Sequence, residues 1–429
     1  MPKLLIYSHD TYGLGNIRRM LAIAAHLSKR NPDLSILLVS GSPMLHAFRV
    51  EPQIDFIKLP CLSRLETGKY VSVHRGVDIE QVLRIRANIL ECTIRDFQPD
   101  VLLVDKKPIG LEGELGPAFD TMENAASRPH LVLLLRDILD CPERTRAVWA
   151  KNRYCDAIET YYDRVLVVGN RSVFDVAENY SFPHAVAKKM RYCGYLERER
   201  SPHSIQATRQ ELGLSARGKM VLVTVGGGAD GQKILNCYIQ GLKNSPQGAG
   251  HKSLLLCGPE MPLEQRSRFE TLASRLPGVQ VREFTDDIMR YMAAADVVIS
   301  MAGYNTICEL LTLKKNAIVV PRTKPVLEQF IRAKRLAELG LVKTIFPDEL
   351  QPELLASSVR AALEEGAIRR ANNCHMDMGG LDRVEEEILS LMGAPSKVYL
   401  PNFMPGSHRR TVFKTDFKTN VRPISLEQE

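Results

Sequence analysis

The stretch Lys3-Leu4-Leu5-Ile6-Tyr7-Ser8-His9-Asp10-Thr11-Tyr12-Gly13-Leu14-Gly15-Asn16 begins with an apolar run and ends in a turn with two glycines. Residues 17–28 then carry apolar side chains at helical spacing, so the sequence predicts a strand, a glycine turn and a helix. A second apolar run at 35–39 completes a strand–helix–strand unit of the usual length. Units of this kind predict a parallel sheet that is covered by helices.

The alternation of apolar runs and helical segments continues along the chain. In the first half, further buried strands are predicted at 101–104, 131–135 and 165–168. After a polar stretch, a second series of strands is predicted at 220–225, 253–257, 279–284, 297–300 and 317–320. The sequence therefore predicts an α/β fold with two Rossmann-like, doubly wound parallel-sheet lobes that face a cleft. We expect an N-terminal lobe at 1–196, a linker at 197–217, a C-terminal lobe at 218–394 and a basic tail at 395–429.

The composition excludes several classes of protein. The chain has 429 residues, of which 45% are hydrophobic and 25% charged, so it can bury a sizeable core and does not resemble a disordered segment. Its apolar runs are far shorter than the ~18–20 residues of a membrane-spanning helix, and the apolar stretch at the N-terminus is too short for a signal peptide. We therefore expect a cytoplasmic protein.

The cysteines and the charged residues narrow the set of partners. Nine cysteines without a C-x-x-C pair indicate reduced thiols, with neither a disulfide framework nor a metal site. The formal net charge is +7, and the basic residues are interspersed with acids, so we do not expect nucleic acid as a partner. Phosphorylated or other anionic ligands, or an anionic membrane surface, suit this charge.

Neither glycine loop carries a complete nucleotide-binding motif. The first, Gly13-x-Gly15-x-x-Arg18, lacks the third glycine of the dinucleotide fingerprint, and no acidic residue follows the next strand. The second, Gly226-Gly227-Gly228, is not followed by the Gly-Lys-Ser/Thr order of a P-loop. The backbone amides of either loop can receive a phosphate or a sugar hydroxyl, and either loop can equally be a plain tight turn.

The most informative segment follows the strand predicted at 297–300. It reads Ala302-Gly303-Tyr304-Asn305-Thr306-Ile307-Cys308-Glu309-Leu310. Because the residues from Gly303 to Thr306 open a helix after a buried strand, their amides and the helix dipole favour a diphosphate without a metal ion. Glu309 lies one turn further on, where a carboxylate can accept hydrogen bonds from two ribose hydroxyls. The alternative is that Asn305 and Thr306 are ordinary caps and that Glu309 faces solvent.

Together with Phe284-Thr285 before it and Glu328-Gln329 after it, this segment resembles the nucleotide-sugar domain of the GT-B glycosyltransferases, in particular the MurG-like family 28. The resemblance implies a GT-B fold and the transfer of a hexose from a UDP-sugar, similar to UDP-GlcNAc, to an acceptor hydroxyl. It implies that Glu309 binds the ribose, that the backbone of Phe284 and Thr285 faces the uracil, and that Glu328 and Gln329 bind the hexose. MurG has a second Gln where this chain has Glu328, so the donor sugar stays open.

The remaining candidate donor-binding residues come from the two glycine loops: Gly13, Gly15, Asn16, Gly226, Gly227 and Gly228. The chain contains no Asp-x-Asp, the motif that holds a divalent ion under the diphosphate in the other large class of glycosyltransferases. We therefore expect neither a metal ion nor any cofactor besides the UDP-sugar substrate.

The catalytic base is the point at which this chain departs from the family. MurG-like enzymes have a His at the position of Asn16, and an amide cannot take a proton at neutral pH. His9 and Asp10, at the end of the first strand, are our candidates for the base, and Asp105, at the end of another strand, is the next. Each of them can instead be a loop or cap residue.

Two other functions stay open at this level. A UDP-N-acetylhexosamine 2-epimerase shares the fold and needs several carboxylates in the N-terminal lobe, for which the sequence offers Asp10, Asp105, Glu112 and Glu114. A non-catalytic nucleotide-sugar-binding protein would explain Asn16 as the loss of a catalytic group.

The acceptor is not determined, and a lipid-linked molecule and a carbohydrate are both expected candidates. Residues 61–76 form a loop-rich region that carries Arg64, Lys69, His74 and Arg75. This region is a candidate for peripheral contact with the inner face of the membrane or for a lid over the acceptor, and it is equally compatible with a solvated loop.

Overall fold

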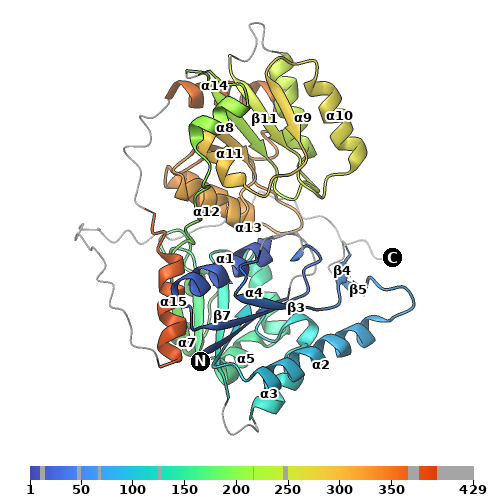
Figure 1. Cartoon of the computed structure of the whole chain (residues 1–429), viewed down its shortest axis with the longest axis vertical. Coiled ribbons are helices and arrows are strands. Elements are labelled where there is room, and N and C mark those ends of the chain that lie inside the picture. The colour runs from blue at the N-terminus through green and yellow to red at the C-terminus, as the bar shows by residue number, and fades with distance from the viewer. Residues whose placement is uncertain are drawn as a thin grey trace, which may run out of the picture. The chain divides into compact units, whose positions relative to one another are not determined.

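Two parallel sheets with flanking helices make up the fold (Figure 1). The computed structural model describes residues 1–9, 15–45, 50–65, 69–123, 128–215, 217–244, 250–365 and 376–393. Residues Met1–Pro395 form one compact unit, and the predicted tail at 395–429 lies outside the described residues.

The N-terminal sheet has seven strands in the order β3-β2-β1-β6-β7-β8-β9. All neighbours are parallel, and Leu4 on β1 pairs with Ile36 on β2 and with Val101 on β6. The strands are β1 (Lys3–Ser8), β2 (Ser35–Ser40), β3 (Ile54–Lys58), β6 (Val101–Asp105), β7 (His130–Arg136), β8 (Arg164–Val168) and β9 (Met190–Tyr192). The helices are α1 (Gly15–Arg30), α2 (Ile79–Phe97), α3 (Gly116–Glu123), α4 (Pro142–Lys151), α5 (Tyr154–Tyr161), α6 (Val176–Asn179) and α7 (His184–Lys189).

The C-terminal sheet has six parallel strands in the order β12-β11-β10-β13-β14-β15. Its strands are β10 (Met220–Thr224), β11 (Lys252–Leu256), β12 (Val279–Arg282), β13 (Val297–Ser300), β14 (Asn316–Val319) and β15 (Lys343–Thr344). The helices are α8 (Ile205–Glu211), α9 (Gln232–Lys243), α10 (Leu263–Ala273), α11 (Ile288–Ala294), α12 (Tyr304–Thr312), α13 (Glu328–Glu338) and α14 (Pro352–Glu365).

The predicted parallel α/β architecture is confirmed, because every strand predicted from an apolar run is present within two residues of its expected ends. Interior strands such as β1, β6, β10 and β13 are buried on both faces, which is why their sequences are apolar, whereas the edge strand β12 is only partly buried. The sequence analysis did not predict the edge strands β3, β9 and β15. It also missed the antiparallel hairpin of β4 (Leu62–Arg64) and β5 (Tyr70–Ser72), whose three-residue strands are too short for an alternation signal.

The last helix corrects one predicted boundary. We assigned 218–394 to the C-terminal lobe, but α15 (Gly380–Leu391) packs on α1 beside the N-terminal sheet (Figure 1). Glu385 of α15 lies 3.0 Å from Nε2 of His26 and 3.0 Å from Nε of Arg30, both on α1. Val384 and Ile388 are fully buried in the same apolar cluster as the inner face of α1. Because these contacts join residues more than 350 positions apart, no local pattern predicted them.

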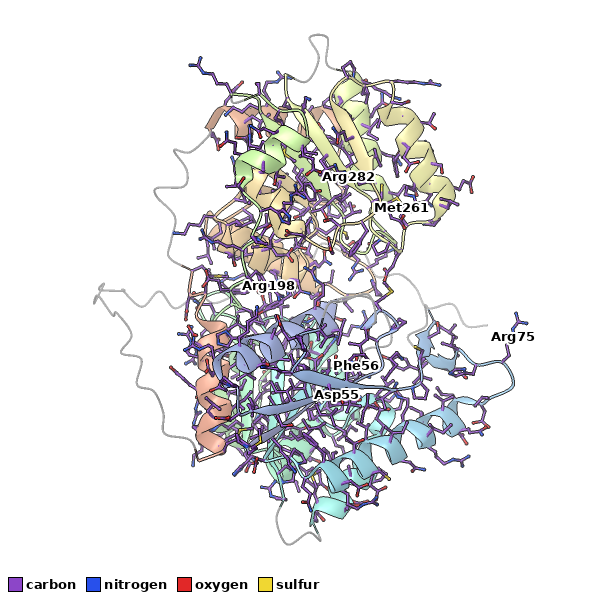
Figure 2. The ribbon with its side chains drawn as sticks, in the orientation of Figure 1. Asp55, Phe56, Arg75, Arg198, Met261 and Arg282 are labelled. Carbon is purple, nitrogen blue, oxygen red and sulfur yellow. The ribbon has the colours of Figure 1, made fainter. Side chains whose placement is uncertain are left out.

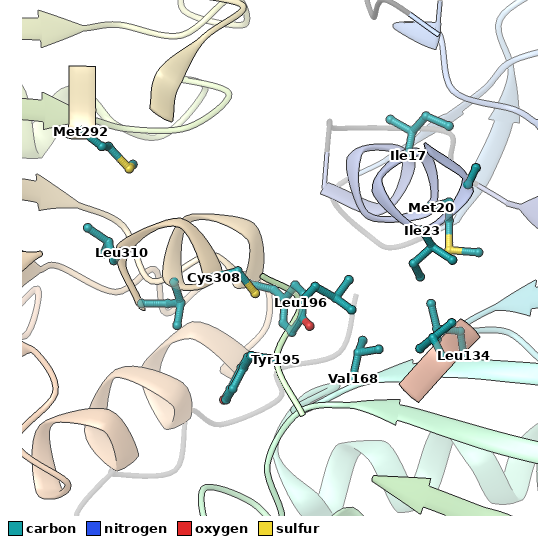
Figure 3. Packing of buried hydrophobic residues seen from close by; sticks show 14 of the residues in the cluster. Ile17, Met20, Ile23, Leu134, Val168, Tyr195, Leu196, Met292, Cys308 and Leu310 are labelled. Atoms are coloured by element: carbon teal, nitrogen blue, oxygen red, sulfur yellow. The ribbon is translucent and has the colours of Figure 1, made fainter. Parts of the chain in front are cut away.

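A short segment between the sheets joins their cores. Tyr195 and Leu196 are fully buried, and they lie between Val168 of β8 and Cys308 of α12 in one continuous apolar cluster (Figure 3). Arg198 follows them in the same connection (Figure 2). The helix start at Gly303, which the sequence analysis singled out, is therefore packed against this connection.

Candidate active site

The N-terminus of α12 has the features of an anion-binding site. Gly303 caps the helix in an extended conformation, and the N–H of Ile307 donates to the carbonyl of Gly303 over 2.9 Å. The amides before Ile307 precede the first turn of helix hydrogen bonds, so they have no acceptor within the helix. Among the described residues, a Cβ placed on Gly303 would meet only Nε2 of Gln329, at 4.0 Å, so this part of the chain leaves the space beside the turn open.

Glu309 lies in the same helix and is buried, with 1% of its surface exposed. Its Oε1 accepts a hydrogen bond of 2.6 Å from the guanidinium of Arg18, which lies on α1. The carboxylate therefore faces the glycine-loop helix of the N-terminal lobe. The alternative in which Glu309 faces solvent is wrong.

The side chains of Tyr304 and Asn305 tie the helix start to its surroundings. Nδ2 of Asn305 donates to the carbonyl of Gly15 over 2.8 Å, and Oδ1 of Asn305 accepts from Arg198. The ring of Tyr304 stacks on that of Tyr195, with 5.9 Å between centroids. Because the side chain of Asn305 is engaged, the backbone of the turn and the half-buried Thr306 are the groups left for a ligand.

The two residues predicted to bind the hexose open α13, and both are buried. Glu328 forms an ion pair with Arg136, which ends β7 of the N-terminal sheet. Oε1 of Gln329 accepts a 3.1 Å hydrogen bond from the backbone N–H of Arg322. Gln329 is thus near Gly303, whereas Glu328 is joined to the opposite sheet.

The second glycine loop, after β10, packs against the loop that follows β11. Gly226 and Gly228 have positive φ angles, +64° and +97°, and a Cβ on Gly228 would lie 2.1 Å from the carbonyl oxygen of Cys257. A Cβ on Gly227 would lie 2.6 Å from a carboxylate oxygen of Glu260. The glycines therefore have a structural reason to be there, and their predicted contact with the donor stays a prediction.

The loop predicted to face the uracil follows β12. Phe284 is 45% exposed, and Oγ1 of Thr285 accepts a 3.1 Å hydrogen bond from the N–H of Asp287. Side chains that point to solvent or to their own turn leave the backbone of this loop accessible.

His9 directly follows β1, at the carboxyl end of this interior strand, and its hydrogen bonding suits a general base. It is buried, and its Nδ1 lies 3.1 Å from the carbonyl oxygen of Asp105. Because a carbonyl can only accept, Nδ1 carries the proton and Nε2 keeps its lone pair. Burial, reinforced by Lys107 and Lys106, holds the pKa of His9 well below 6.5. His9 is therefore neutral at physiological pH.

The other candidate bases are placed differently. Asp105 is fully buried, and its Oδ1 accepts a 2.5 Å hydrogen bond from Arg19 of α1. The same guanidinium donates to Oδ1 of Asn16 over 3.1 Å. Asp10 and Gly13 lie outside the described residues.

Several cations of this region were not singled out from the sequence as site residues: Arg19, Lys106, Arg136, Arg198 and Arg332. Arg332 binds the buried Asp137 through two hydrogen bonds of 2.8 and 2.6 Å. Arg136 directly follows the strand predicted at 131–135, and Lys106 comes two positions after the strand predicted at 101–104. Basic residues at the carboxyl ends of parallel strands were thus the signal available in the sequence.

Residues 220–377 match the family model described as the glycosyltransferase family 28 C-terminal domain. The match spans the C-terminal lobe and less than half of the chain, and over these residues the chain is similar to that family. This match contains Phe284, Thr285, the turn from Gly303 to Glu309, and Glu328 and Gln329.

Comparisons over the whole chain extend this assignment. The UDP-N-acetylglucosamine–N-acetylmuramyl-(pentapeptide) pyrophosphoryl-undecaprenol N-acetylglucosamine transferase of Caldicellulosiruptor saccharolyticus is 24% identical over 393 residues, 88% of this chain and 96% of the relative. Among solved structures, MurG of Acinetobacter baumannii has a TM-score of 0.58 at 16% identity and covers 91% of this chain and 100% of its own. A putative UDP-N-acetylglucosamine 2-epimerase from Listeria monocytogenes has a TM-score of 0.61 at 13% identity, covering 91% and 96%. The chain has the GT-B fold.

Among the described residues, the one group with the geometry of metal ligands is His26, Asp382 and Glu385, between α1 and α15, and both of its carboxylates already pair with Arg30. Among the helices that the structure describes, none has the length and hydropathy needed to cross a membrane.

Proposed function

We propose that this protein is a UDP-sugar-dependent glycosyltransferase that moves a hexose to an acceptor hydroxyl without a metal ion. The observation that carries the proposal is the turn from Gly303 to Glu309. It combines free helix-start amides with a buried carboxylate one turn further on, inside the segment that matches the family 28 model. The relatives named as N-acetylglucosamine transferases favour UDP-GlcNAc as the first donor to test.

Donor binding has to displace one contact. The guanidinium of Arg18 binds Oε1 of Glu309 and the Glu309 side chain is only 2% exposed, so a ribose can reach this carboxylate only if Arg18 moves. We propose that the ribose replaces Arg18, which is one-third exposed and so can turn towards solvent or towards the diphosphate. The diphosphate then lies on the amides before Ile307, where the helix dipole stabilises the charge that develops on departing UDP.

The acceptor hydroxyl needs a base, and His9 suits this role better than Asp105. Nε2 of His9 has a lone pair at neutral pH, whereas Asp105 is fully buried and is held through its Oδ1 in an ion pair with Arg19. In the proposed reaction Nε2 takes the proton as the acceptor oxygen attacks the anomeric carbon.

The epimerase alternative is less well supported by the N-terminal lobe. One of its candidate carboxylates, Glu114, is buried beneath the sheet edge, where Arg86 binds both of its oxygens over 2.6 and 2.8 Å. Tyr7 donates to the same carboxylate. Glu112 is exposed, so Glu112 and Glu114 do not form the cluster of carboxylates that elimination and addition require.

For the acceptor, we propose a lipid-linked molecule reached at a membrane surface. The relative from Caldicellulosiruptor saccharolyticus is named for a pyrophosphoryl-undecaprenol substrate. In this chain the segment around β4 and β5 exposes Leu65 and Val73, at 48% and 55%, together with the exposed Lys69, His74 and Arg75 (Figure 2). Apolar side chains among cations suit an anionic bilayer. Val73→Asp should abolish sedimentation with vesicles of phosphatidylglycerol, and unchanged sedimentation contradicts this surface.

One assay separates the three functions. The protein is incubated with UDP-GlcNAc, with and without a lipid-linked acceptor, in the presence and absence of EDTA. A transferase consumes the donor quickly only with an acceptor and is unaffected by EDTA. An epimerase converts UDP-GlcNAc by itself, and a non-catalytic protein only binds it. Fast turnover without an acceptor, or loss of UDP binding on chelation, contradicts the proposal.

A further inference from the structure

Among the residues that the structure describes, Lys106 is a cation without a partner, and it lies at the carboxyl end of the central strand β6. It directly follows the last residue of β6 and has a φ of +63°. Its backbone N–H donates to the carbonyl of Leu134 over 2.9 Å, which holds it at the strand end. The side chain is half-buried, and no hydrogen bond or ion pair joins its ammonium to the residues that the structure describes.

The charges around Lys106 leave an excess of cations. Arg136 and Lys107 oppose its charge, whereas Glu328 and Asp105 favour it. Both carboxylates already have arginine partners, Glu328 with Arg136 and Asp105 with an arginine of α1. Nε of Arg136 is itself buried and donates to no acceptor in the described part of the chain. The Lys106 ammonium and Nε of Arg136 therefore both keep unused hydrogen-bond donors, at the carboxyl ends of the neighbouring strands β6 and β7.

Unused donors of this kind are costly unless a ligand supplies acceptors. Removing a cation from water without a partner is unfavourable, and accordingly burial lowers the pKa of Lys106 to about 8. Charge-assisted hydrogen bonds from the cation to a carboxylate or phosphate replace the hydrogen bonds to water that burial removed. An arginine and a lysine together suit an oxyanion, since the first offers a planar pair of donors and the second a compact charge.

We propose that Lys106 and Arg136 form an oxyanion subsite for a negatively charged group of the substrate, beside Glu328. The proposal rests on the proposed glycosyltransferase function for the identity of that substrate. The charged group is a carboxylate or a phosphate, and it belongs either to the donor hexose, as in a uronic acid, or to the acceptor. A charged donor sugar is consistent with Glu328 standing where MurG has a glutamine, because Arg136 neutralises Glu328 and leaves Lys106 for the ligand.

The test compares Lys106→Met, which removes the charge and keeps the length, with Lys106→Arg, which keeps the charge. Lys151→Met, on an exposed position of α4, is the matched control. Calorimetry measures the affinity of each protein for UDP, UDP-glucose and UDP-glucuronic acid. Inorganic phosphate is then titrated into protein that is saturated with UDP, so that the site at Gly303 is filled and phosphate reports on a second anion site.

Two results support the subsite and tell its sources apart. If the donor carries the charge, wild-type protein binds UDP-glucuronic acid tenfold or more tightly than UDP-glucose, and Lys106→Met removes the difference. If the acceptor carries it, the two donors bind alike, and Lys106→Met weakens phosphate binding to the UDP complex tenfold or more. In both cases Lys106→Arg recovers part of the loss and Lys151→Met has no effect.

Equal affinity for the two donors, together with phosphate binding that is absent or unchanged in Lys106→Met, contradicts the subsite. Failure of wild-type protein to bind UDP at all contradicts the proposed function instead. The melting temperature separates binding from folding, because Lys106→Met replaces an unpaired cation by an apolar side chain and should not lower the Tm. Loss of binding together with a lowered Tm in Lys106→Met, without rescue by Lys106→Arg, assigns Lys106 a structural role and also overturns the proposal.

Discussion

At the scale of single residues, Glu309 separates nucleotide binding from other roles of α12. Hydrogen bonds to a charged acceptor contribute ~1.5–3 kcal/mol, so Glu309→Ala should weaken UDP binding roughly ten- to a hundredfold. Pyrophosphate, which lacks the ribose, should bind the variant about as well as the wild type. Calorimetry of both ligands checks this, and unchanged UDP affinity in a folded Glu309→Ala protein contradicts the assignment.

Arg18, the ion-pair partner of Glu309, provides a second test of the nucleotide site. Arg18→Met removes the guanidinium that occupies Oε1 of Glu309, so the ribose no longer has to displace it. We expect UDP affinity in Arg18→Met to stay equal to that of the wild type or to rise. A loss comparable to that of Glu309→Ala would show that Arg18 itself holds the nucleotide.

His9 is the residue whose removal should affect chemistry and not nucleotide binding. A general base contributes ~10²–10⁴ to the rate, so His9→Ala should lower kcat about a hundredfold or more. UDP affinity should change less than twofold, because the nucleotide site lies on α12. Steady-state kinetics and calorimetry measure the two quantities, and a matching loss in both removes His9 from the role of base.

The same residue sets the acid limb of the pH profile. Burial holds the pKa of His9 well below 6.5, so the neutral base is already present at pH 6.5 and kcat should be flat from there to pH 8 as far as His9 is concerned. Below pH 6.5 the unfolded chain binds the proton more readily than the folded one, so the stability contributed by His9 falls as the pH decreases. An acid limb centred above pH 6.5 that disappears in His9→Ala contradicts this environment.

At the scale of elements, the glycine loop after β10 depends on close packing. Gly228 combines a φ of +97° with a carbonyl oxygen 2.1 Å from a Cβ, whereas Gly226 has a φ of +64° and open space. Gly226→Ala should cost about 1–2 kcal/mol from backbone strain alone, and Gly228→Ala about 3 kcal/mol or more, because the loop after β11 must also move. Denaturant unfolding measures both, and equal losses would show that the clash relaxes freely.

At the scale of the whole molecule, one buried ion pair joins elements of the two sheets. Asp137, after β7, accepts two hydrogen bonds from Arg332 of α13 and a third of 2.8 Å from the hydroxyl of Tyr195. Both charged side chains are fully buried. The pair thus connects the sheet that carries His9 to the helix that carries Gln329.

Breaking this pair should affect the whole unit. Arg332→Met leaves the Asp137 carboxylate buried without its cation, which costs about 3–5 kcal/mol, whereas Lys334→Met at an exposed position of α13 should cost less than about 1 kcal/mol. The double variant Arg332→Met/Asp137→Leu should recover much of the loss. Urea unfolding measures all three, and a small effect of Arg332→Met contradicts a role of the pair in holding the unit together.

The amino-acid sequence by itself determined the class of fold and the segment that makes the donor site. A parallel strand that is buried on both faces has to be apolar throughout, so strands such as β1, β6 and β13 were visible as short continuous runs. The turn after β13 was equally readable, because a glycine cap and a carboxylate one turn later are local features of a single helix. Edge strands such as β3 have mixed exposure, and so they left no such signal.

Only the tertiary structure decided how these local features are used. Arg18 meets Glu309, Arg136 meets Glu328, and α15 returns to α1, across separations of nearly 200 to more than 350 positions. Such contacts depend on the packing of whole sheets, and many acid and base pairs of the chain would satisfy the same charge rule. The lack of a partner for Lys106 is a property of this packing as well, since a lysine after a strand is ordinary in the sequence and becomes significant only where neighbouring carboxylates are already paired.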